Sequence, residues 1–119
     1  LGDVYKRQVL EGQISGSALT PSVVRKMSRA FAGMSVTDAA IEELLLWYYE
    51  VVDEVGQNIR EHAQLGSNPA AFIDAIDKMK DLMMLGWMRR MLVKAGEDAE
   101  ERGYKRIDVE QLIHLDPFE

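Results

Sequence analysis

Apolar residues recur at steps of three and four along most of the chain, which predicts an all-helical protein. The longest such stripe belongs to a helix that begins after the cap residues Ser35 to Asp38 and runs to about Leu65. Its members are Ile41, Leu44, Leu45, Tyr48, Val52, Val55 and Ile59. Further apolar residues, Trp47 among them, lie off the stripe, so this helix is apolar on more than one side and must be covered on more than one side.

Two coverings are open for the long helix, namely the rest of the domain or a second chain. Because one chain of this length can hardly cover such a helix alone, we expect a stable dimer. Its interface is predicted at Leu44, Trp47, Tyr48 and Val52. We expect the Trp47 ring to be buried there, and its removal to unfold or dissociate the protein.

Turn and cap residues divide the rest of the chain into further helices. Thr20 and Pro21 begin a short helix that Gly33 ends. After the break at 66–69, a stripe from Phe72 to Ala95 predicts a second long helix over residues 69–102. Gly86 and Gly96 interrupt that helix, and each costs about 1 kcal/mol relative to alanine, so we expect a kink or break near one of them.

A last short helix follows near the end of the chain. Asp108 is its predicted N-cap, with Gln111 at the matching position of a capping box. Four apolar residues are predicted to face inward from it: Val109, Leu112, Ile113 and Leu115. No stretch alternates with the period of a strand, so the sequence predicts an all-α domain of four or five helices.

The 119 residues fit a single domain, which we expect over residues 20–116. Residues 1–8 resemble an adapter-derived read-through, and residues 1–19 are therefore expected to be a disordered or artefactual lead-in. The longest unbroken apolar run has six residues, far short of the roughly 20 that cross a bilayer. We expect no membrane partner and a cytoplasmic location.

The chemistry of an enzyme or a metal site is missing from the sequence. There is no cysteine, which excludes disulfides and thiolate ligands. His62 and His114 lie on different predicted helices, and neither completes a Glu-x-x-His pair. The acidic set Glu50, Asp53 and Glu54 has helical spacing, but a solvated face explains it better than a cation site. We expect no enzymatic activity, no metal and no cofactor.

Two segments of the chain resemble the histone fold, especially the archaeal histones. The first is PSVVRKMSRAFAGMSVTDAAIEELLLWYYEVVDEVGQNIREHAQ, which combines a short basic helix, an Ala-Gly turn, a Val-Thr-Asp cap and a long helix. The second is AEERGYKRIDVEQLIHL, which resembles the second loop and third helix of the family. In it, Gly103 and two basic residues precede Ile107, and an Asp-Val pair then starts a short helix.

The chain departs from the family in two places. In the family the second loop directly follows the long helix, whereas here the segment from Leu65 to Glu101 intervenes. The first loop also carries Ser35 where the family has an arginine. The resemblance therefore implies a histone-like fold with an inserted helical segment.

The resemblance also implies a site for double-stranded DNA. In the histone fold the first helix and the second loop lie on the surface that meets the duplex. The basic residues at these positions are Arg25, Lys26, Arg29, Arg102, Lys105 and Arg106. The implied function is that of an architectural or regulatory DNA-binding protein, non-catalytic, nucleoid-associated, and acting as a homodimer or as a heterodimer with another helical protein.

A different class of function stays open beside this one. The formal net charge is −6, which weakens a nucleic-acid interpretation, and basic residues near helix ends are favoured there without any ligand. The methionines are numerous on one predicted helix: Met79, Met83, Met84, Met88 and Met91. They fit ordinary core filling better than a soft binding groove, but a groove would suit an acidic protein–protein interaction module that binds no nucleic acid.

Overall fold

Helices dominate the computed structural model, which describes residues 19–65 and 68–119. The elements in chain order are α2 (Pro21–Met27), η1 (Ser28–Ala32), β1 (Ser35–Val36), α3 (Asp38–Leu65), α4 (Pro69–Met83), α5 (Gly86–Glu101), β2 (Arg106–Ile107) and α6 (Val109–Leu112). The predicted all-α class is confirmed, and within the described ranges the strands amount to two residues each. Residues 1–18, nearly all of the expected lead-in, lie outside the described part, whereas Leu19 is buried in the core.

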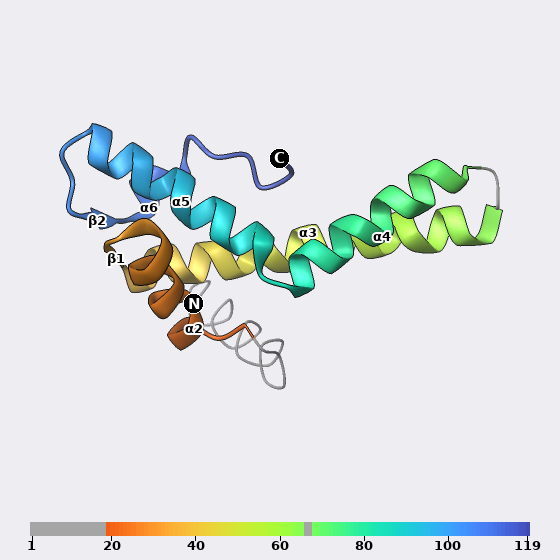
Figure 1. Ribbon diagram of the computed structural model, residues 1–119, viewed down its shortest axis with the longest axis horizontal. Helices are drawn as coiled ribbons and strands as arrows, with labels where there is room; N and C mark the ends of the chain where they lie inside the picture. Colours follow the sequence, from red (N-terminus) through yellow and green to blue (C-terminus); the bar gives the residue numbers. More distant parts are fainter. Residues whose placement is uncertain (1–18, 66–67) are drawn as a thin grey trace, which may run out of the picture.

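The long helix α3 is covered by elements of its own chain. Figure 1 shows α4 returning along the distal half of α3, so that the two helices form an arm, while α5 continues back along the proximal half. Helices α2 and α6 also contact α3. Leu44 and Tyr48 are consequently buried inside one chain. Their prediction as dimer contacts is wrong, because the inserted segment folds back over them.

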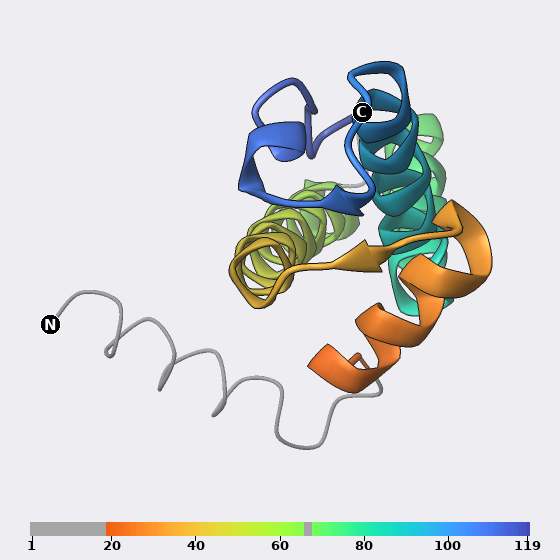
Figure 2. The same cartoon turned by 90° about the vertical axis from the view of Figure 1, so that its left-hand side faces the viewer.

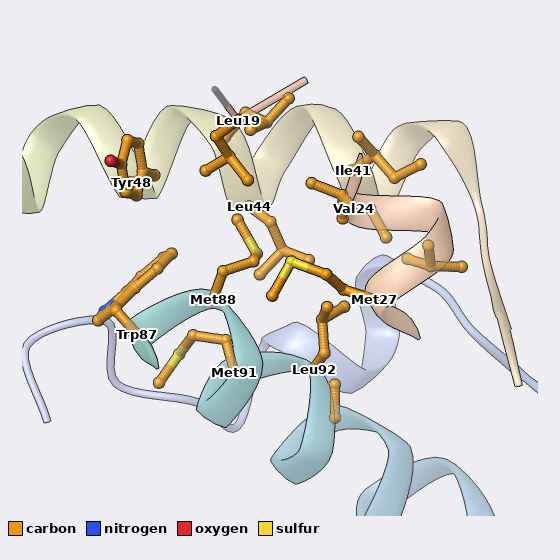
Figure 3. Close-up of a cluster of buried hydrophobic side chains, with 14 of the residues drawn as sticks. Leu19, Val24, Met27, Ile41, Leu44, Tyr48, Trp87, Met88, Met91 and Leu92 are labelled. Atoms are coloured by element: carbon orange, nitrogen blue, oxygen red, sulfur yellow. The ribbon is translucent and has the colours of Figure 1, made fainter. Parts of the chain in front are cut away.

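The core lies between the proximal half of α3, α2 and α5 (Figure 3). Met88 of α5 points toward α3 in this core, and both Met88 and Met91 are fully buried. Met83 and Met84, in contrast, are 70% and 81% exposed at the bend between α4 and α5. The methionines therefore divide between core filling and an exposed corner.

The expected break near Gly86 is confirmed, since the inserted segment forms two helices rather than one. Leu85 has φ 65°, in the left-handed region that ends a helix, and α5 begins at Gly86. Across this bend Arg90 pairs with Asp81, and the guanidinium lowers the pKa of that carboxyl. Gly96 does not break α5.

Gly96 instead allows a close approach between α5 and η1. A Cβ added at Gly96 would lie 2.9 Å from the Cβ of Ala32, closer than such atoms come. The π-helical turn η1 can therefore rest directly on α5 only because position 96 has no side chain.

We expect Gly96→Ala to lower the free energy of unfolding. The added methyl group overpacks the contact with η1 at a cost of about 1–3 kcal/mol, which outweighs the helix-propensity gain of about 1 kcal/mol. Gly56→Ala is the matched control, because its Cβ would meet the nearest atoms, of Arg60 and Met79, at 3.7 and 3.8 Å. That variant should gain up to about 1 kcal/mol. Urea unfolding of both decides the matter, and a Gly96 variant as stable as the Gly56 variant would rule out the close contact.

Candidate nucleic-acid interface

Strands β1 and β2 bring the two loops of the chain side by side. They pair in parallel, with Ser35 opposite Arg106 and Val36 opposite Ile107. The backbone N–H of Thr37 extends the pairing by donating to the carbonyl of Ile107 at 2.9 Å. Figure 2 shows the two strands together at one end of the molecule, which we call the loop end. Two segments far apart in the sequence thus form one surface.

A hydrogen-bond network joins the helix starts behind these strands. The Thr37 hydroxyl accepts from the backbone N–H of Ala40 and donates to the Asp108 carboxylate at 2.9 Å. Asp108 also accepts from the N–H of Val109, while the Gln111 side chain accepts from the N–H of Asp108. The predicted capping box is therefore confirmed. The N-termini of α3 and α6 are fastened to each other through it.

Asp108 is held in its charged form by this network. The backbone N–H of Val109, then the Thr37 hydroxyl, and to a smaller extent the nearby Arg106, lower the pKa of its carboxyl. A carboxyl with a lowered pKa stabilises the fold above the ordinary value and loses that contribution as pH falls through the lowered value. The Asp108 network therefore contributes its full stabilisation at neutral pH and loses it in acid.

The six predicted DNA-binding residues are all exposed, and they lie on elements that meet at or next to the loop end. Arg25 and Lys26 lie on α2, Arg29 lies on η1, and Arg106 lies on β2 itself. Arg102 and Lys105 lie in the turn between α5 and β2. Arg25 also bonds Asp38, the first residue of α3, at 2.9 Å.

Two of these six basic residues form ion pairs with acidic neighbours. Arg25 pairs with Asp38, and Arg102 pairs with Asp98 at 3.2 Å. Arg102 also lies 2.9 Å from the Nε2 atom of His114. Among the residues that the structure describes, no carboxylate oxygen lies within 4.0 Å of the charged groups of the remaining four: Lys26, Arg29, Lys105 and Arg106.

Two features of this region could not be predicted from the sequence. The bond between Thr37 and Asp108 joins residues 71 positions apart, which no local pattern reveals. Arg89 of α5 lies with its guanidinium over the Phe31 ring of η1, 4.5 Å from the ring centroid. The approach of η1 to α5 creates this second contact, and that approach depends on tertiary packing.

Other candidate sites carry less chemistry. Within residues 19–65 and 68–119, no three His, Asp or Glu side chains are placed to hold a metal ion, and no described helix has the length and apolarity to cross a membrane. A cleft of about 200 Å³ lies between α3, α4, α5 and the residues after α6. Of the charged groups in its wall, Asp81 and Arg90 pair with each other, and Lys78 pairs with Asp74 at 3.0 Å. Glu54 and Glu119 also line the cleft, and neither has an ion pair among the described residues.

The loop end therefore offers the clearest arrangement for binding a ligand of defined chemistry. There the backbone is held by the pairing of β1 with β2, and exposed lysine and arginine side chains lie nearby that can contact phosphates. Comparison of the chain with known protein families, with curated proteins and with solved structures finds no match.

Proposed function

We propose that the protein is a histone-fold-like DNA-binding protein, architectural or regulatory and without catalysis. The observation that supports it best is the parallel pairing of β1 with β2. This pairing unites the two segments that resemble the histone fold, and it gathers their basic residues near one end of the molecule. Arg106 lies in the pairing itself, and Lys105 directly precedes it.

The proposed binding is electrostatic and has little sequence preference. Lysine and arginine side chains neutralise phosphates and release counterions, whereas sequence is read through contacts to base edges. The net charge of −6 repels the duplex, so affinity should be modest and should depend strongly on salt. Action as a dimer stays a prediction. Of the predicted interface residues, Trp47 and Val52 still reach the surface.

A titration of random-sequence duplex at salt concentrations from 50 to 200 mM tests this function, since phosphate contacts are lost over roughly that range. Replacing Lys105 and Arg106 together with alanine should weaken binding to all sequences alike. It should also flatten the dependence of log affinity on log salt by about two units per chain. The physical reason is that each cation removed leaves one phosphate with its counterions.

The matched control replaces Lys78 and Lys80 with alanine. These two lysines lie on α4, in the arm that points away from the loop end (Figure 1), and they carry the same charge. We expect this variant to keep the salt dependence of the wild type nearly unchanged. If the wild type fails to bind duplex even at 50 mM salt, the DNA-binding function is wrong.

Two observations favour a second candidate function, an acidic helical module that binds other proteins and no nucleic acid. Met83 and Met84 are large, flexible and mostly exposed at the bend between α4 and α5. The net charge of −6 suits such a module better than it suits a DNA-binding protein. The same titration separates the two, because this candidate predicts no duplex binding at any salt concentration.

A further inference from the structure

An exposed aromatic ring of η1 makes a cation–π contact with an arginine of α5. Phe31 is 44% exposed, and the guanidinium of Arg89 lies over its ring at 4.5 Å from the centroid. The ring quadrupole attracts the guanidinium, so the contact favours a position of the long Arg89 side chain beside η1.

The position of Phe31 follows from how η1 is anchored. The buried Ser28 hydroxyl donates to the carbonyl of Met34 at 2.8 Å, which closes the turn. Ala32 rests on Gly96, so η1 lies directly against α5. Phe31, next to Ala32 in the chain, is thereby held close to α5, and its ring contacts Arg89 in the first turn of that helix.

The charge of Arg89 is not neutralised by a neighbour. Its sequence neighbour Arg90 pairs with Asp81, but no carboxylate oxygen of the described residues lies within 4.0 Å of the Arg89 guanidinium. A contact with a ring face uses none of the guanidinium N–H donors, which stay available for a phosphate. Arg29, on η1 with Phe31, and Lys26, just before η1, are likewise without such a carboxylate.

We propose that Arg89 is a further phosphate-contacting residue of the DNA interface and that Phe31 is its positioning residue. This inference rests on the proposed DNA-binding function. It extends the contact surface from the loop end along η1 to the start of α5, where the backbone phosphates of the same duplex are the ligand. An arginine suits this role because its planar group can bond a phosphate with two N–H donors at once.

The test is the same salt titration with Arg89→Gln, against Lys94→Gln as the control. Lys94 is exposed on the same helix, five positions further on and so about 140° around the helix axis, and it has no ion pair among the described residues. Both variants remove one positive charge. Arg89→Gln should lower the salt slope by roughly 0.9, so that the wild type loses roughly 3.5-fold more affinity than this variant between 50 and 200 mM salt. Lys94→Gln should leave the slope unchanged.

The role of Phe31 needs its own pair of variants. Phe31→Ala removes the ring and should shift the slope part of the way toward that of Arg89→Gln, whereas Phe31→Tyr keeps a ring and should restore the wild-type slope. Equal slopes for the two Phe31 variants would overturn the positioning role.

The outcomes separate this inference from the function on which it rests. Wild-type binding that depends on Lys105 and Arg106, with equal slopes for Arg89→Gln and Lys94→Gln, would overturn the inference alone. Absence of duplex binding by the wild type at 50 mM salt would overturn both.

Discussion

Replacing Trp87 with alanine is expected to lower the free energy of unfolding by about 3–5 kcal/mol, a large part of the 5–15 kcal/mol typical of a small domain. The Trp87 side chain is 3% exposed, and its ring centroid lies 6.0 Å from that of Tyr48. Its indole N–H donates to the carbonyl of Pro117 at 2.6 Å, so the ring also holds the residues after α6 against the core. Truncation leaves a cavity and an unpaired carbonyl together.

The control for this prediction is the other tryptophan. Trp47, expected from the sequence to be buried, is only half-buried, and its indole N–H bonds Glu43 within the same helix at 2.9 Å. Trp47→Ala should therefore cost clearly less than Trp87→Ala, and His62→Ala in the arm should cost little. Thermal and urea unfolding of the three variants give the order. A greater loss for Trp47→Ala than for Trp87→Ala would mean that the core lies elsewhere on α3.

The helix boundaries could be predicted because the signals that set them are local. Thr20 caps α2 through its hydroxyl, and Gly33 ends η1 with φ 70°. The capping box of Asp108 and Gln111 is contained within four residues. A local hydrogen bond needs no knowledge of the rest of the fold, so residue type and spacing suffice to find it.

The covering of α3 could not be predicted in this way. An apolar stripe shows that a surface is buried, but it does not say which element covers it. The left-handed Leu85 marks the bend at which the inserted segment changes direction between α4 and α5, and leucine is not a residue that marks such a turn. The expected second chain at Leu44 and Tyr48 was inferred for lack of that information.

The candidate interface was predictable in its residues but not in its charge balance. The six cations follow from the resemblance to the histone fold. Their acidic partners depend on distances in space. Arg25, for example, bonds Asp38, which lies 13 positions away in the sequence. The proposed role of Arg89 could not come from the resemblance, because Arg89 lies in the segment that has no counterpart in the family.

The direction in which α6 faces is a further correction. Val109 and Ile113 were expected inward but are exposed, Ile113 by 72%, whereas Leu112 is 1% exposed. Helix α6 has four residues, Val109–Leu112, so it completes barely one turn and shows no repeated stripe. Any apolar residue of so short a helix fits an inward position equally well by pattern alone, and packing against α3 and α5 decides.

Leu112→Ala is accordingly expected to cost about 2–5 kcal/mol of unfolding free energy, while Ile113→Ala should stay within about 0.5 kcal/mol of the wild type. Among the four residues of α6, Leu112 is the one apolar residue that is buried. Helix α6 follows β2, the strand that pairs with β1. Losing this anchor should loosen the Thr37–Asp108 network and, if the loop end binds DNA, weaken duplex binding at low salt as well. Urea unfolding measures the first effect and the duplex titration the second. A larger loss for Ile113→Ala would show that α6 turns its other side to the core.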